Sequence, residues 1–185
     1  MKFILLLIIT IFASMNLNAY SYAAAGKEPT IDAMEAILAS INKDDFKSAE
    51  EVFIKYKKNY KYLNDEFNEK LYDGLNQSID KKDKKSIGKW LNISIATEIE
   101  RRLDGGFKNI KQFNVSKVML AKVNKFYNLL FTSLNSIENE KLKLAIKKCT
   151  ESIGNPGLFG VGAKPVNIEM YKKNQKIALK ILQSL

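Results

Sequence analysis

The residues best suited to chemistry are Glu98, Arg101 and Arg102, which lie close together in the stretch 90–107. Arg101 and Arg102 are the only arginines in a chain that has 28 lysines. On a helix, spacings of three and four residues bring Glu98 into contact with both guanidinium groups. Two interpretations follow. Either the three residues form an internal ion pair that fixes the register of the helix, or the guanidinium forks bind the carboxylate or phosphate of a ligand.

Two further carboxylates, Glu100 and Asp104, are the candidate metal ligands. They are four residues apart, so on one helix they repel each other unless a cation lies between them. Hard divalent cations prefer oxygen ligands of this kind. The spacing therefore predicts a candidate metal site at Glu100 and Asp104. The metal ion would be a binding partner and not a resident cofactor.

Catalytic chemistry finds little support in the composition. The chain has no histidine, which excludes histidine-based triads and imidazole metal sites. Cys149 is the only cysteine, so the chain forms no disulfide within itself. It shares an apolar stripe with Leu142 and Ile146, which favours a buried thiol over a reactive one or an intermolecular disulfide. We predict that the protein is not an enzyme and carries no cofactor.

A glycine-rich loop at 154–166 contains a candidate ligand-binding lysine, Lys164. The phosphate-loop pattern G-x-x-x-x-G-K-[ST] is absent, and a proline follows the lysine. Backbone amides of a glycine-rich turn can still hold an anion. The alternative is a structural plug, in which Leu158, Phe159 and Val161 fold back and are buried at the end of the domain.

These residues need an element that positions them, and the stretch from Asp83 to Asp104 is predicted to be a central helix. Its apolar residues cover every side of a helical wheel, which is typical of a helix in the middle of a domain. Gly105 and Gly106 are expected to end it, because two interior glycines would cost about 2 kcal/mol relative to alanine.

The other helices are expected at 31–41, 45–60, 65–79, 114–134, 136–153 and 167–182. In each of them apolar residues recur at helical spacing, and no segment alternates with the period of a strand. The sequence therefore predicts an all-α protein, an antiparallel bundle of six or seven helices. A helix–turn–helix rhythm relates Asp44, Asp83 and Asn114, but their spacing is too irregular for a solenoid.

The N-terminus has the layout of a signal peptide. Lys2 supplies a positive charge, 3–12 is apolar, and Ala23 and Ala25 have the A-x-A spacing of a cleavage site. We expect residues 1–25 to be removed and 26–185 to form a single domain. Retention of the segment as an anchor is the alternative. The expected location is periplasmic or secreted.

The positive charge is confined to one half of the chain. Residues 1–104 hold 16 basic and 16 acidic residues, whereas 105–185 hold 14 lysines and four glutamates, which accounts for the whole net charge of +10. Nucleic acid is not expected as a partner of an exported protein. The expected partners are an anionic small molecule, an envelope polysaccharide or an acidic protein, with peripheral contact to an anionic membrane as a further option. Solvation of helical faces by scattered lysines remains the simplest alternative.

The segment 37–79 resembles the helical hairpins in extracytoplasmic domains of bacterial iron permeases and imelysin-type proteins. The resemblance rests on Asp44-Asp45-Phe46-x-x-Ala49, then Tyr56, Tyr60 and Leu71-Tyr72-x-x-Leu75. The G-x-H-x-x-E motif of the imelysin type is missing, as are the membrane helices and carboxylate motif of the permeases. The resemblance therefore implies surroundings of metal uptake and supplies no site residue.

Two functions remain open at this point. The first is an exported binding or accessory module of the cell envelope, which recognises an anionic or metal-bearing partner through Glu98, Arg101, Arg102 and Lys164. The second is a basic structural or interaction protein that docks on anionic surfaces and has no specific ligand.

Overall fold

The computed structural model describes residues 28–158 and 161–185, so the expected signal peptide at 1–25 lies outside the described residues. Within these ranges the chain forms eight α-helices, one short 3₁₀-helix and two isolated β-bridges. The elements are α2 (Pro29–Ile41), α3 (Phe46–Lys55), α4 (Lys57–Glu66), α5 (Leu71–Asp80), α6 (Lys84–Lys108), α7 (Phe113–Leu130), η1 (Phe131–Ser133), α8 (Ser136–Ser152) and α9 (Ile168–Leu182). Among the described residues, no helix combines the length and apolar character needed to cross a membrane.

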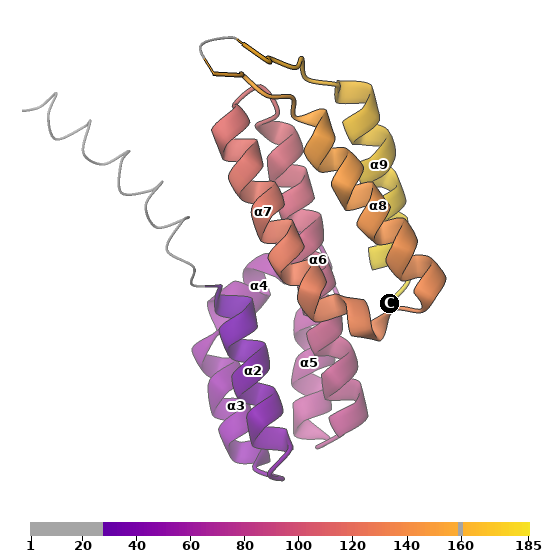
Figure 1. Ribbon diagram of the computed structural model, residues 1–185. Helices are drawn as coiled ribbons and strands as arrows, with labels where there is room; N and C mark the ends of the chain where they lie inside the picture. Colours follow the sequence, from indigo (N-terminus) through magenta and orange to yellow (C-terminus); the bar gives the residue numbers. More distant parts are fainter. Residues whose placement is uncertain (1–27, 159–160) are drawn as a thin grey trace, which may run out of the picture.

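The long helix α6 is the centre of the fold. Every residue from Ile93 to Ile99 is buried, so this part of the helix is covered on all sides. Helices α2, α4 and α5 pack on it together with α7 and α9. In Figure 1, α2, α3 and α5 occupy the lower half of the view and α7, α8 and α9 the upper half, with α6 running through both. The prediction of an all-α bundle around a buried central helix is confirmed.

Two turns of the N-terminal half have the same local geometry. Asp45 and Asp83 are the N-caps of α3 and α6, and each accepts a hydrogen bond from the backbone N–H of the serine three residues on. The residue before each cap has a positive φ, 60° and 54° respectively. Asp45, and not Asp44, is thus the residue whose position in its turn is equivalent to that of Asp83. One turn type is used twice to reverse the chain between packed helices.

Three predicted helix boundaries are wrong. One of them is the start of the helix expected at 65–79, because Asp65 and Glu66 belong to α4 and α5 begins only at Leu71. The helix expected at 45–60 is divided at Tyr56, whose φ of −98° and ψ of 12° interrupt the helical path between α3 and α4. This division explains why there is one helix more than the expected upper number. The helix expected to end near Asp104 continues through Gly105 and Gly106 to Lys108.

Packing explains why the helix continues through the two glycines. A Cβ on Gly106 would lie 2.6 Å from Tyr171 Oη, so only glycine leaves room for the fully buried Tyr171 side chain of α9. The Tyr171 hydroxyl donates a hydrogen bond of 2.8 Å to the Leu103 carbonyl of α6. Packing of α6 against α9 therefore offsets the low helix propensity of the glycines. A prediction from helix propensity alone does not include this tertiary contact.

Candidate functional site

The predicted cluster on α6 forms, and it is internal. Glu98 is buried, and its Oε2 lies 2.8 Å from Arg101 Nη2 and 3.7 Å from Arg102 Nη2. The Arg102 side chain is 8% exposed and the Arg101 side chain 24%. As the three- and four-residue spacings predicted, Glu98 contacts both guanidinium groups on one face of the helix. The guanidinium groups meet carboxylates of the protein itself.

Two members of the cluster were missed by the sequence analysis. Glu28, the N-cap residue of α2, is buried, and its Oε2 lies 2.7 Å from Arg102 Nη2. Its Oε1 lies 2.8 Å from the ammonium of Lys122 on α7. Glu28 follows the expected signal peptide by only a few residues. No pattern in the sequence pairs it with Arg102.

The electrostatics of Glu28 reflect this pairing. Burial raises the pKa of the Glu28 carboxyl, but the hydrogen bond from Lys122 and the charges of Arg102 and Lys122 outweigh burial and hold it below its ordinary value. Glu28 is therefore ionised at neutral pH. Its negative charge joins the start of α2 to α6 and α7.

Neutral polar groups complete the cluster around Glu98. Thr30 of α2 donates a hydrogen bond of 2.7 Å to Glu98 Oε1, and Asn59 of α4 donates one of 2.8 Å to the Thr30 hydroxyl. The guanidinium of Arg102 also lies 5.8 Å from the ring centre of Phe126. Four helices thus meet at one buried polar cluster, which favours the register-fixing interpretation of the arginines.

One buried polar atom of this cluster, Arg102 Nε, lacks a hydrogen-bond partner among the described residues. Burial raises the pKa of the neighbouring Tyr60 hydroxyl, and the charges of Tyr56 and Glu98 add to the rise. A hydrogen bond with Ser94 opposes this rise in pKa. Unpaired buried polar atoms are rare in proteins, so Arg102 Nε is the observation that still supports a ligand at the arginines.

The candidate metal ligands have partners within the chain. Glu100 Oε1 accepts a hydrogen bond of 3.2 Å from Gln183, and Asp104 Oδ2 lies 2.8 Å from the ammonium of Lys108. Burial raises the pKa of the Glu100 carboxyl, and the nearby charge of Asp104 adds to the rise despite the hydrogen bond from Gln183. In the described ranges, no three His, Cys, Asp or Glu side chains gather as metal ligands. A metal held by Glu100 and Asp104 stays a prediction.

Cys149 is a buried residue on α8 and is not available for reaction. Its side chain is completely buried, and its thiol contacts the backbone oxygen of Tyr171 at 3.8 Å. Burial raises the pKa of the thiol to about 12, so the reactive thiolate is scarce at neutral pH. The preference for a structural cysteine agrees with this geometry.

Lys164 belongs to a different feature from the arginines. It lies in a hairpin formed by 155–158 and 161–164, where bridges pair Asn155 with Lys164 and Leu158 with Val161. Lys164 makes no hydrogen bond or ion pair with the α6 cluster among the described residues. The four predicted ligand-binding residues therefore do not form one site.

The expectation of a buried plug is wrong for the residues that the structure describes. Leu158 is 75% exposed and Val161 is 80% exposed, while Phe159 lies outside the described residues. Paired backbone groups hold the two arms of the hairpin together, so the chain does not fold back over its own apolar residues. In Figure 1 the hairpin extends over the end of the bundle where α6 turns into α7.

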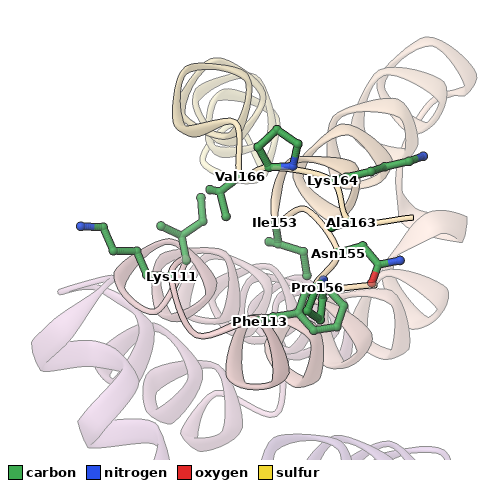
Figure 2. A pocket seen from close by; sticks show the side chains of 10 residues that line it. Lys111, Phe113, Ile153, Asn155, Pro156, Ala163, Lys164 and Val166 are labelled. Atoms are coloured by element: carbon green, nitrogen blue, oxygen red, sulfur yellow. The ribbon is translucent and has the colours of Figure 1, made fainter. Parts of the chain in front are cut away.

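An apolar cavity of about 510 Å³ lies at the root of the hairpin, against the turn between α6 and α7. Figure 2 shows Lys111 and Lys164 reaching outward on opposite sides of it. The stems of both lysines line the cavity, together with Ile110, Phe113, Ile153, Asn155, Pro156, Ala163, Pro165 and Val166. This end of the molecule combines exposed aliphatic groups with lysines that point into solvent.

Comparisons with protein-family models, with curated proteins and with solved structures gave no match for this chain. The resemblance of 37–79 to iron permease and imelysin-type domains therefore stays a prediction.

Proposed function

We propose that this chain is an exported, non-enzymatic interaction module of the cell envelope that docks on an anionic phospholipid surface through its basic C-terminal half. The alternative with a specific ligand is less well supported, because Arg101 and Arg102 already pair with Glu98 and Glu28. The docking end is the one that carries the hairpin.

The observation that carries the proposal is the set of lysines in 105–185 that have no ion pair with a described carboxylate. In the described part of this half, Lys108, Lys122, Lys147 and Lys148 form ion pairs with carboxylates. The lysines outside any such pair are Lys111, Lys117, Lys141, Lys143, Lys164, Lys172, Lys173, Lys176 and Lys180. Unpaired lysines near a bilayer with anionic lipids are each worth about 1 kcal/mol of attraction.

Exposed aliphatic side chains lie among these lysines, and they favour phospholipid over a polysaccharide. Ile177 of α9 is partly exposed beside Lys173, Lys176 and Lys180, in a shallow depression of about 590 Å³ that also includes Leu179. A hydrophilic polyanion gains nothing from such groups, whereas the headgroup region of a bilayer accommodates both charge and aliphatic surface.

Sedimentation with vesicles tests the proposal. Wild-type protein should bind vesicles that contain phosphatidylglycerol, should not bind pure phosphatidylcholine vesicles, and should lose binding as salt is raised. Changing Lys111, Lys164 and Lys173 to glutamine together should weaken binding by about 100-fold at low salt.

The control removes the same charge from the other half of the chain. Lys47, Lys57 and Lys58 are exposed on α3 and α4 and are changed to glutamine together. This variant should bind within about threefold of wild type, because its charges lie outside the proposed surface. Equal losses in both triple variants would contradict a defined docking surface. Absence of binding by wild type would contradict the proposal itself.

One observation keeps the ligand-binding alternative as a second candidate function. The cluster on α6 combines three cationic side chains with two carboxylates, and Arg102 Nε has no partner within the described residues. If a small anion binds there, inorganic phosphate or citrate should raise the melting temperature even in high salt. Changing Arg101 and Arg102 to lysine should abolish this rise, because lysine cannot provide the planar fork. No rise with either anion would exclude this candidate.

A further inference from the structure

The hairpin after α8 exposes two aliphatic side chains, one on each of its described arms. Leu158 and Val161 face each other across the last bridge and are the most exposed large apolar residues that the structure describes. Isolated exposed apolar residues are common on protein surfaces. Here two of them are paired across one β-bridge, which calls for a more specific explanation.

Backbone hydrogen bonds join the two described arms of the hairpin, 155–158 and 161–164. Asn155 and Lys164 exchange hydrogen bonds of 2.9 and 2.8 Å, and Leu158 and Val161 exchange hydrogen bonds of 3.1 and 3.0 Å. Gly157 has a φ of +73°, and a Cβ there would collide with the Val161 carbonyl, so glycine is required at this bend. The exposure of Leu158 and Val161 is thus set by a specific backbone shape.

The charge within the hairpin segment is of one sign, and it interacts with the carboxylate of Glu151 on α8, whose pKa is lowered by the hydrogen bond from Lys148 and in part by the charge of Lys164. The segment 154–166 contains no acidic residue. Lys111 and Lys164 flank the root of the hairpin and point outward on its two sides (Figure 2). An apolar end followed by a collar of lysines matches the order of layers in an anionic membrane, where hydrocarbon is followed by phosphate.

We propose that the hairpin is a membrane-insertion element. Leu158 and Val161 enter the boundary between the acyl chains and the headgroups of an anionic bilayer, while Lys111 and Lys164 contact lipid phosphates. This inference rests on the proposed function and deepens it, because it names which part of the molecule enters the lipid and therefore how the bundle is oriented.

Other occupants fit this hairpin less well. A stable protein partner buries about 1,000 Å² or more, far above what two side chains offer. A second copy of the chain would bring the same lysines against Lys111 and Lys164, and like charges repel. A lipid surface requires only a small apolar insertion, supported by attraction of the lysines around it.

A fluorescent label on the hairpin tests insertion directly. Val161→Cys, labelled with the polarity-sensitive dye NBD, should show a blue shift and a rise in emission on phosphatidylglycerol-containing vesicles. Cys149 does not compete for the dye, because it is completely buried and its pKa is raised to about 12. The control is Asn42→Cys, on the exposed turn between α2 and α3 at the opposite end of the molecule (Figure 1). Its emission should stay unchanged.

The outcomes separate this inference from the proposed function. If the protein sediments with anionic vesicles but the label at 161 stays in a polar environment, docking stands and insertion is wrong. If the label shifts equally on phosphatidylcholine vesicles, insertion stands and the requirement for anionic lipid is wrong. If the protein binds neither kind of vesicle, both are wrong.

A second variant pair tests insertion without a label. Leu158→Asp combined with Val161→Asp should weaken vesicle binding by about 30-fold, because both side chains lose apolar transfer free energy. Ile137→Asp combined with Leu144→Asp removes another largely exposed pair from α8, with 66% and 56% of their surfaces exposed, and adds the same charge. This control should weaken binding by less than about fivefold. Similar losses in both pairs would overturn the inference, with melting temperatures checking that all variants fold.

Discussion

Replacing Arg102 with methionine should lower the free energy of unfolding by about 3 kcal/mol. Arg102 is the residue that contacts both buried carboxylates of the α6 cluster, Glu28 at 2.7 Å and Glu98 at 3.7 Å. Methionine fills much of the same volume but leaves both negative charges short of a partner in a buried environment. Urea unfolding followed by circular dichroism measures the loss, with an unchanged m-value as the check on two-state behaviour.

A matched substitution on the neighbouring residue separates burial from charge. Arg101→Met removes the same charge from the same helix, but the Arg101 side chain is three times as exposed as that of Arg102. After this change Glu98 keeps Thr30 and Arg102 as partners. The expected loss is about 1 kcal/mol. Equal losses for the two variants would contradict a special role of the buried guanidinium.

A double variant tests whether the loss comes from the unpaired carboxylate. Glu28→Met combined with Arg102→Met removes both partners, and Lys122 can then turn toward solvent because it is partly exposed already. Replacing a buried ion pair with apolar residues is often close to neutral. The double variant should therefore be more stable than Arg102→Met alone. A double variant that is less stable would show that the pair itself contributes net stability.

The same cluster predicts a pH dependence with a defined sign. The pKa of Glu28 is lower in the folded protein than its ordinary value of 4.5, so the unfolded chain binds the proton more tightly. The stabilisation by Glu28 is then complete above pH 4.5 and is lost as pH falls through the folded pKa. Acid titration of Glu28→Gln should show a shallower decline in stability than wild type over this range.

The helical class was predictable because it depends on local spacing. Apolar residues at intervals of three and four along the chain predicted the central helix, and burial of every residue from Ile93 to Ile99 matches the all-round apolar pattern. Two helix caps with a side-chain acceptor, Asp83 and Asn167, also lie where the sequence starts those helices, whereas α8 is capped by Asn135 and not by Ser136. These features involve residues within one or two helical turns of each other.

The composition of the buried cluster was only half predictable for the same reason. The contact of Glu98 with Arg101 and Arg102 follows from helix geometry, whereas Glu28 lies 74 residues from Arg102 in the chain. A pairing at that separation depends on how α2 docks against α6. Similarly, the bonds between the arms at 155–158 and 161–164 kept Leu158 and Val161 in solvent, although their apolar character alone predicted burial.

Substitution of Gly106 should have a large effect on the free energy of unfolding, and one contact accounts for it. Gly106→Ala should lower the free energy of unfolding by about 2 kcal/mol, because the new methyl group would lie 2.6 Å from Tyr171 Oη. The gain in helix propensity, about 1 kcal/mol, is already included in this net value. Gly88→Ala on the same helix is the control, since nothing lies within 4 Å of a Cβ there. It should raise stability by about 1 kcal/mol.

Removing the Tyr171 hydroxyl should rescue the alanine. Tyr171→Phe alone loses the hydrogen bond to the Leu103 carbonyl and should cost about 1 kcal/mol. Combined with Gly106→Ala it also removes the atom with which the methyl group collides. The two changes should therefore be less harmful together than the sum of their separate effects, by about 1 kcal/mol or more in a double-mutant cycle. Additive effects would mean that movement of α9 relieves the collision. Contact with the Tyr171 hydroxyl would then not be the reason why α6 has a glycine at position 106.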